Sequence, residues 1–444
     1  MTERPFPPGP RGRPLVGNLP EFAGDMLAFV ERCRRDYGDV VGLKLAHWPT
    51  YLVHHPDLVE ELLVHRPRDY TKHHAFFWSN VEAIFGRGLL TNEGDDWLRQ
   101  RRLIQPAFQP ERVARYAEIM VERTERMLAG WRPGELRDVR KEMMALTFQI
   151  VAETLFGADV RDDVAEIGAA FNTGIEEIAV RFRRPIRFPD WVPVPSNLRY
   201  NRAVRRMDDL ILRIIRERRA KGFEERDDLL SRMLRARDEA GAMDEGQLRD
   251  EVMTMLLAGH ETTALGLTWT WYLLSKHPEV DARLHDQVLA VMGDRPPEPA
   301  DLTRLHYAER VFREGLRLYP PAYGFGREAT QDSELGGWPV PTGTTLIVFS
   351  WLLHRDPRWW DDPLRFDPDR WDGDLEEKLP RLAYMPFGAG PRVCIGQRFA
   401  IAEGILIVSA IARRFRLEWL ADPVPFTSIT LRPTGDLRAR LIPR

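Results

Sequence analysis

Apolar residues recur with a helical period over much of this chain. They stand three or four positions apart from Arg99 to about Gly157, from Asp163 to Phe182 and from Leu198 to Lys221, as on one face of an amphipathic helix. The proline-rich residues 188–197 separate the last two stretches. Residues 55–65 are also predicted to be helical. The pattern therefore predicts a chain that is mainly helical.

One predicted helix is much longer than the others. Asp244 and Gln247 have the spacing of a capping box, and the pattern that they open continues to a helix of about 32 residues, a rod of roughly 48 Å. Its residues 252–274 are long enough to span a bilayer. His260 and Glu261 stand at the middle, however, and a charge there would be costly in lipid. The segment is therefore predicted to be a helix buried in protein.

Strand-like patterns are short. Val40–Leu45 and Thr50–His54 are joined by a tight turn and predict a hairpin, and further short strands are expected at Thr344–Ser350 and in the C-terminal part of the chain. We find no low-complexity tract, internal repeat or long linker. The predicted fold class is thus mainly α with a minor β region, and residues 1–444 are expected to form a single domain.

Composition and charge exclude several classes of protein. With 43% hydrophobic residues among 444, the chain can bury a large core. A net charge of −3 gives no reason to expect nucleic acid as a partner. The first 20 or so residues lack the apolar core of a signal peptide. We therefore expect a soluble cytoplasmic protein with no transmembrane anchor.

The two cysteines, Cys33 and Cys394, cannot form a disulfide framework or most of a four-ligand zinc site. Cys394 lies in "FGAGPRVCIGQRFA", residues 387–400, among glycines and arginines. A dinucleotide fingerprint would need a third glycine where Val393 stands, and a P-loop would need Gly-Lys-Ser/Thr. A nucleophilic cysteine would need a partner histidine, and a buried structural cysteine is the default for a single thiol.

The interpretation that uses the whole stretch is a thiolate ligand to haem iron. Gly390 and Gly396 would let backbone N–H groups approach the sulfur of Cys394, and a helix that begins near Ile395 would place its positive end beside it. Such donors stabilise a thiolate and tune its electron donation. Arg392 would supply positive charge to a haem propionate.

The spacing Phe387-x-x-Gly390-x-Arg392-x-Cys394-x-Gly396 resembles the haem-binding signature of the cytochrome P-450 superfamily and matches it at every defined position. The resemblance extends over nearly the whole chain and is strongest to the bacterial branch related to fatty-acid and carotenoid hydroxylases. It implies haem b held between a long central helix and the cysteine loop, with Phe387, Gly388 and Gly396 among the contacts. The implied activity is O2-dependent monooxygenation.

The stretch "AGHETT", Ala258 to Thr263, is similar to the oxygen-activation site of that family. The resemblance implies that Ala258 and Gly259 leave room for O2, and that Glu261 and Thr262 are catalytic and relay protons. Glu261 would point about 100° away from Thr262, towards a solvent path. In the alternative interpretation, Glu261 forms a structural ion pair and Thr262 bonds back to the carbonyl of Ala258. His260 is expected to pack or face solvent.

The resemblance also implies two groups of charged residues around the haem. A structural triad would combine Glu314 and Arg317, which share a helix face, with Arg370. Partners of the propionates would be basic or polar side chains from several parts of the chain: Trp97, Arg101, Arg327, Arg392 and, more weakly, His354.

Substrate and partners are the least defined expectations. The resemblance places aromatic residues around the pocket, namely Phe76, Phe77, Trp78, Tyr323 and Phe325. They imply an apolar small molecule such as a fatty acid, terpenoid or carotenoid. No flavin or nicotinamide fingerprint appears, so electrons from NAD(P)H would come through a ferredoxin or flavodoxin and its reductase to a monomer. A peroxide-driven haem enzyme and a haem sensor or carrier are alternatives, and the Glu261–Thr262 pair favours the monooxygenase.

Overall fold

The protein is described by a computed structural model over residues 6–72, 81, 83–183, 189–224, 226–238 and 241–444. These residues are mainly helical with small sheets, which confirms the predicted fold class. The chain forms two compact units. Unit 1 takes residues 1–79, 317–365 and 370–394, and unit 2 takes residues 80–316, 366–369 and 395–444. The single domain over 1–444 stays a prediction.

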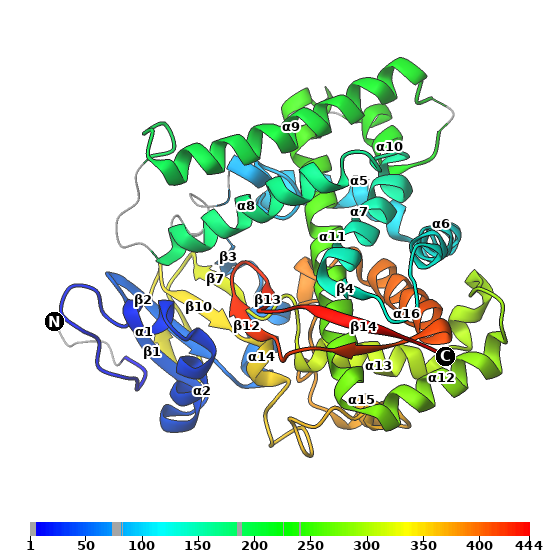
Figure 1. Ribbon diagram of the computed structural model, residues 1–444. Helices are drawn as coiled ribbons and strands as arrows, with labels where there is room; N and C mark the ends of the chain where they lie inside the picture. Colours follow the sequence, from blue (N-terminus) through cyan, green and yellow to red (C-terminus); the bar gives the residue numbers. More distant parts are fainter. Residues whose placement is uncertain (1–5, 73–80, 82, 184–188, 225, 239–240) are drawn as a thin grey trace. The chain divides into compact units, whose positions relative to one another are not determined.

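Unit 1 is built on a five-stranded mixed sheet of order β1-β2-β10-β7-β3. The predicted hairpin is present: β1 (Val40–Leu45) pairs antiparallel with β2 (Trp48–Val53). β10 (Thr345–Val348) pairs parallel with β2 and antiparallel with β7 (Phe325–Ala329), while β3 (Tyr70–Thr71) forms the other edge. Segments far apart in the sequence therefore lie side by side, blue beside yellow in Figure 1.

Several short elements complete unit 1. They are α1 (Leu19–Ala23), α2 (Met26–Tyr37), α3 (Pro56–Glu60), α14 (Ser350–Leu353), α15 (Leu375–Lys378) and the hairpin of β8 (Ser333–Leu335) and β9 (Trp338–Val340). A π-helical turn, Glu61–His65, continues α3. Its Leu62 and Leu63 are buried with Val348 and Met385 in one apolar cluster. The sheet, the π-helical turn and the segment before Cys394 thus share one core.

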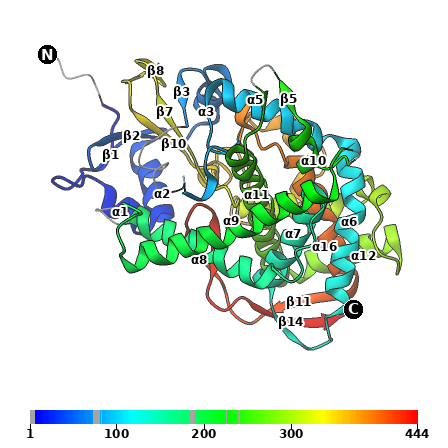
Figure 2. The ribbon, with the colours of Figure 1, turned by 90° about the horizontal axis from the view of Figure 1, so that it is seen from above.

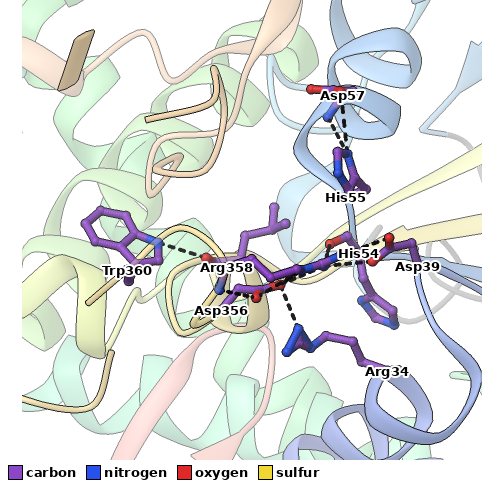
Figure 3. A network of polar contacts seen from close by, with 9 residues as sticks. Arg34, Asp39, His54, His55, Asp57, Asp356, Arg358 and Trp360 are labelled. Carbon is purple, nitrogen blue, oxygen red and sulfur yellow. Dashed lines mark hydrogen bonds and ion pairs between the residues drawn. The ribbon is translucent and has the colours of Figure 1, made fainter. Parts of the chain in front are cut away.

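A buried carboxylate fastens α2 to the segment after α14 (Figure 3). Asp356 is 1% exposed and accepts hydrogen bonds at 2.7 Å from Arg34 and from Arg358. Arg358 also donates to Asp39 at 2.7 Å. His54 lies in the same network, and burial lowers its pKa to about 3. The network therefore pairs two arginines with two aspartates around a neutral imidazole.

Unit 2 is a helical assembly around α11 (Glu245–Lys276). α7 (Val139–Phe156) packs along α11, and α6 (Pro110–Ala129) packs on α16 (Gln397–Arg414). α8 (Val164–Arg183) and α9 (Pro195–Lys221) lie side by side, and α9 crosses α11 (Figures 1 and 2). The remaining helices are α5 (Gly94–Ile104), α10 (Leu229–Arg235), α12 (Pro278–Met292) and α13 (His306–Leu318).

Small antiparallel sheets complete unit 2. β11 (Phe415–Trp419), β14 (Arg438–Pro443) and β4 (Leu136–Asp138) form a sheet of order β11-β14-β4. β12 (Val424–Thr427) and β13 (Leu431–Thr434) form a hairpin, called here the C-terminal hairpin. A pair of two-residue strands, β5 (Arg237–Asp238) and β6 (Gly241–Ala242), precedes α11. The short strands predicted near the C-terminus are therefore confirmed.

The long helix agrees with its prediction. α11 has 32 residues, and the side chain of Asp244 accepts a hydrogen bond from the amide of Gln247 at 2.7 Å at its start. Most of its side chains are buried, including Trp269 and Trp271, because other elements surround it. Within the described residues, no helix is both long and apolar enough to cross a membrane.

The helical stretch predicted from Arg99 to Gly157 is in fact three α-helices, a 3-10 helix (Gln105–Phe108) and a strand. α5 ends at Ile104, α6 begins at Pro110 and ends at Ala129, and β4 precedes α7. Proline lacks an amide hydrogen and breaks a helix except at its first turn. The apolar spacing resumes in each helix, which hides the breaks. Because proline is tolerated in the first turn of a helix, α9 can begin at Pro195, three residues before the predicted start.

Candidate functional site

Glycines shape the loop that carries Cys394 in unit 1. Gly388 and Gly390 have φ angles of +70° and +67°, which side chains rarely adopt. A Cβ atom on Gly390 would lie 1.8 Å from the carbonyl oxygen of Leu63, so no other residue fits there. The amide of Cys394 donates to the carbonyl of Phe387 at 2.9 Å. The loop therefore turns back on itself and ends at Cys394.

The two cysteines have opposite surroundings. Cys33 in α2 is 2% exposed, and burial raises the pKa of its thiol to about 11. Cys394 is exposed. The Cys33 thiol is therefore a packed side chain, while Cys394 lies at the surface of unit 1.

The surroundings of Cys394 fit a thiolate ligand to haem iron. α16 begins at Gln397, and the amides at the start of a helix favour a nearby negative charge. In the part of the chain that the structure describes, no three His, Cys, Asp or Glu residues are grouped as a metal site would require. A metal that already has four ligands from a porphyrin needs only one ligand from the protein, and a single thiol would be enough.

The centre of α11 in unit 2 presents a small open surface. Ala258 is exposed although most of this helix is buried, and Thr262, on the same face one turn later, is half-buried. Gly259 packs against Val151, where a Cβ atom would come within 3.0 Å. The hydroxyl of Thr262 donates to the carbonyl of Ala258 at 2.7 Å. This back-bond is the alternative that the sequence left open for Thr262.

Glu261 lies off this open surface, and its expected direction towards a solvent path is corrected. The residue is 4% exposed. Its Oε1 accepts hydrogen bonds from Thr430 at 3.0 Å and from Arg432 Nε at 2.7 Å. The rotation of about 100° between neighbouring helical residues turns Glu261 towards the C-terminal hairpin. The structure therefore contains the ion pair that the sequence allowed as an alternative.

His260 is a packing residue, which is one of the two alternatives that the sequence left open. Its ring lies 5.4 Å from that of Phe148 and 4.8 Å from that of Phe171, both in edge-on contact. Its Nδ1 is 2.9 Å from the carbonyl oxygen of Leu256. Complete burial lowers the pKa of the imidazole. His260 is therefore a neutral side chain inside unit 2.

The predicted partners of the propionates are divided between the units. Trp97 and Arg101 lie on α5 in unit 2, and the Arg101 guanidinium is 5.9 Å from the centre of the Trp97 ring. Arg327 on β7 and Arg392 in the cysteine loop belong to unit 1, and both are half-buried. Their meeting at one cofactor stays a prediction.

His354 has a different position from the one expected for a propionate partner. It is completely buried, and its Nε2 accepts a hydrogen bond from the amide of Met385 at 2.9 Å. Its Nδ1 lies 3.1 Å from the carbonyl oxygen of Arg317. Burial holds the pKa of His354 well below its ordinary value. Backbone groups thus occupy both ring nitrogens, so we assign His354 a structural role in place of the propionate contact.

The side chains of the three residues of the predicted triad form hydrogen bonds with backbone groups. Arg317 is completely buried and donates at 3.0 Å to the carbonyl of Arg365, and Arg370 reaches the same carbonyl at 3.4 Å. Glu314 is also completely buried and accepts a hydrogen bond from the amide of Asp367 at 3.1 Å. These contacts agree with a role in stability.

The predicted pocket residues are only partly described. Phe76, Phe77 and Trp78 lie outside the described residues. Tyr323 is 8% exposed and its hydroxyl lies 3.9 Å from the sulfur of Met26. Phe325 packs beneath the cysteine loop, where a Cβ atom on Gly388 would come within 3.2 Å of its ring. Both described aromatic residues therefore contribute to the packing of unit 1.

Sequence reasoning missed Glu403 on α16. Its side chain is completely buried, and burial raises its pKa well above the ordinary value, while the hydroxyl of Thr263 favours the charged form. A neutral carboxylic acid is therefore held beside the residue that follows Thr262. The signal was an acid within the otherwise apolar run "AIAEGILIV".

A second missed group is the charged start of α11. Arg249 donates to the carbonyl of Ile84 at 2.8 Å, and Asp250 accepts from the amide of Arg87 at 2.8 Å. Glu251 is completely buried and accepts from the amide of Leu89 at 3.0 Å. Burial raises the pKa of Glu251 to about 8. This group fixes the segment that leads into α5.

Glu251→Gln should stabilise unit 2 increasingly as the pH rises. The unfolded carboxyl ionises near its ordinary value of 4.5, whereas the folded one stays protonated up to about 8. Stability is therefore lost between these values, by about 3 kcal/mol at most at pH 7. Urea unfolding at pH 5 and pH 7.5 should show a gain for the variant that grows with pH. A gain that is equal at both values, or one that exposed Glu279→Gln also gives, would contradict this origin.

The chain is similar to proteins of one known family. The family model described as "Cytochrome P450" matches residues 7–435. Cyclooctatin synthase of Streptomyces melanosporofaciens is 39% identical over 98% of this chain and 94% of its own length. Cyclooctat-9-en-7-ol 5-monooxygenase of the same organism is 36% identical over 96% and 92%. Pentalenene oxygenase of Streptomyces avermitilis is 34% identical over 100% and 99%.

These matches cover nearly all of each protein, so they concern the whole fold and not the cysteine loop alone. The chain belongs to the cytochrome P450 family and is a haem b monooxygenase that uses O2 and electrons delivered from NAD(P)H by redox partner proteins.

Proposed function

We propose that Cys394 is the thiolate ligand of the haem iron and that Glu261 and Thr262 handle the protons of oxygen activation. The observation that carries the proposal is the exposed thiol of Cys394 at the end of a turn that only glycine at position 390 can form. The bound haem supplies the oxidation in which one atom of O2 enters a substrate C–H bond and the other leaves as water. That balance requires two electrons and two protons.

Other residues of the chain would hold the cofactor. We assign Arg392 and Arg327 in unit 1, and Trp97 and Arg101 in unit 2, to the propionates, because these carboxylates need cationic or hydrogen-bonding partners in an apolar site. Phe387, Gly388, Gly396 and Ala258 would pack against the macrocycle. The small side chain of Ala258 leaves space for O2 on the open surface of α11.

Thr262 is proposed to hold, at its hydroxyl, a proton used in oxygen activation. Its hydroxyl donates to the carbonyl of Ala258, and its oxygen keeps lone pairs that can accept a further hydrogen bond. Glu261 precedes it on the helix and would exchange protons with the interior of unit 2. Thr262 and Glu261 would together link the open surface of α11 with the interior of unit 2.

Thr262→Ala should uncouple electron use from product formation. Without the hydroxyl at position 262, reducing equivalents are consumed but product per equivalent falls by about tenfold or more, the scale of a lost proton-transfer group. The measurement is product formed per NAD(P)H oxidised with a reconstituted redox partner. Thr262→Ser keeps the hydroxyl and should retain most of the coupling. Unchanged coupling in Thr262→Ala would overturn the role.

We further propose a terpenoid substrate. The support comes from the relatives, whose names refer to cyclooctatin, cyclooctat-9-en-7-ol and pentalenene. Terpenoids and long-chain fatty acids should be titrated into the purified haem protein while the absorption change that accompanies loss of iron-bound water is followed. Response to terpenoid hydrocarbons or alcohols supports the proposal, and response to fatty acids alone would contradict it.

A ferredoxin or flavodoxin is the proposed electron donor to a monomeric enzyme. Arg392 and exposed Arg398 flank Cys394 in the sequence and supply positive charge for an acidic partner. We propose a cytoplasmic location, since a ligating thiol must remain reduced.

A further inference from the structure

Three consecutive residues in the C-terminal part of the chain, 430–432, form hydrogen bonds with α11. Thr430 donates to Glu261 Oε1 at 3.0 Å, and Arg432 Nε donates to the same oxygen at 2.7 Å. Trp269, two turns further along α11, donates from its indole nitrogen to the carbonyl of Leu431 at 3.2 Å. β13 is thus positioned by the same helix whose acid it binds.

The contact is dry. Glu261 and Arg432 are each 4% exposed, and Thr430 is 5% exposed. The Arg432 guanidinium also lies 5.9 Å from the centre of the Phe171 ring. Removing one partner of a buried ion pair leaves an uncompensated charge, so Glu261 is unable to leave Arg432 freely.

Further charged side chains lie near the Glu261–Arg432 pair. Arg140, half-buried, has its pKa lowered by burial and by the neighbouring Arg432, while Asp138, Glu176 and Glu261 favour its charge. Glu176 is exposed. Charged side chains therefore extend from the buried Glu261 through Arg432 and Arg140 to the surface of unit 2.

All of these contacts use one oxygen of Glu261. Arg432 Nη2 also forms an ion pair with Oε1. Because both donors hold the carboxylate of Glu261, the orientation of that carboxylate depends on Arg432 and Thr430.

We propose that Arg432, assisted by Thr430, is the positioning residue that orients Glu261 for proton transfer to Thr262. This inference rests on the proposed function of Glu261 and Thr262. It assigns a reaction-linked role to a residue of the C-terminal hairpin that touches neither the reacting atoms nor the cofactor. A merely structural ion pair would affect stability and leave the proton step unchanged.

The test compares Arg432→Gln and Arg432→Lys with Glu261→Gln in the full holoenzyme. Arg432→Gln should lower kcat by about tenfold with KM unchanged and should enlarge the solvent hydrogen isotope effect, because proton transfer becomes slower. Arg432→Lys keeps a cation and should recover part of the loss. Arg416→Gln, on the exposed surface of β11, is the matched control and should change neither quantity.

Two further comparisons separate the possible failures. The double variant Arg432→Gln with Glu261→Gln should be no slower than Glu261→Gln alone, since the arginine acts through the acid. Normal coupling in Glu261→Gln would overturn the proposed role of Glu261 itself. Slow Glu261→Gln with normal kcat and isotope effect in Arg432→Gln would overturn the inference alone, whatever happens to stability.

A measurement without turnover completes the test. The carboxylate infrared band of Glu261, identified as the band lost in Glu261→Gln, should shift in Arg432→Lys and in Thr430→Val. Thr430→Val removes a single hydrogen bond and keeps the ion pair, so it serves if Arg432→Gln does not fold. A band that stays in place in both variants would show that the hairpin does not orient the carboxylate.

Discussion

Cys394→Ala should abolish the thiolate signature of the haem and lower product formation about a thousandfold, which corresponds to about 4 kcal/mol of transition-state stabilisation. Cys394 is the exposed thiol of the two in the chain and lies at the end of a loop whose amides and following helix favour a negative sulfur. No other side chain can supply that donation, because Cys33 is buried in α2.

Cys33→Ala is the matched control for this prediction. Its thiol is 2% exposed with a pKa near 11, so its replacement should leave the spectrum and the rate unchanged. Cys394→His should give a histidine-ligated haem spectrum and little product. A Cys394→Ala protein that keeps a thiolate-type spectrum would overturn the assignment of the ligand.

Gly390→Ala should strip the protein of most of its haem. The added Cβ atom would meet the carbonyl oxygen of Leu63 at 1.8 Å, and the backbone would have to hold φ at +67° with a side chain present. Both effects push the loop away from the π-helical turn. We expect a loss of about 3 kcal/mol in the free energy of unfolding, together with low haem content per chain.

Gly343→Ala separates the two causes. Gly343 also has a positive φ, +82°, but a Cβ atom there would meet nothing within 4 Å. The control variant should show the cost of backbone strain alone, about 1 kcal/mol, and keep its haem. Urea unfolding and haem content measure both variants. Equal effects at the two positions would mean that contact with Leu63 is not what shapes the cysteine loop.

The features predicted well from sequence are local ones. The cysteine loop depends on glycines within a few residues of Cys394, and α11 depends on the Asp244 cap and on apolar residues along its own length. The hairpin of β1 and β2 is likewise a contact between neighbouring segments. In each case the sequence signal comes from residues that are close together in the chain, although the contact of Gly390 with Leu63 also shapes the cysteine loop.

Contacts between residues far apart in the sequence could not be predicted from it. Glu261 is paired with Arg432, 171 residues later, and His354 is bonded to Met385 and Arg317. Nothing near Glu261 in the sequence indicates which arginine it meets. The buried acids Glu251 and Glu403 were missed for the same reason, because burial is a property of tertiary packing.

The helical breaks between residues 99 and 157 had a readable signal. Pro106, Pro110 and Pro133 mark the ends and starts that the apolar spacing concealed. A proline at the first turn supports a helix, whereas one inside it ends the helix, so apolar spacing and proline positions have to be considered together.

The reduced carbon monoxide adduct of the purified wild-type protein tests the ligation of haem iron by Cys394 most directly. We predict a haem-containing protein whose adduct absorbs at the long wavelength of a thiolate-ligated haem. A protein without haem, or an adduct that absorbs like that of a histidine-ligated globin, would contradict the account.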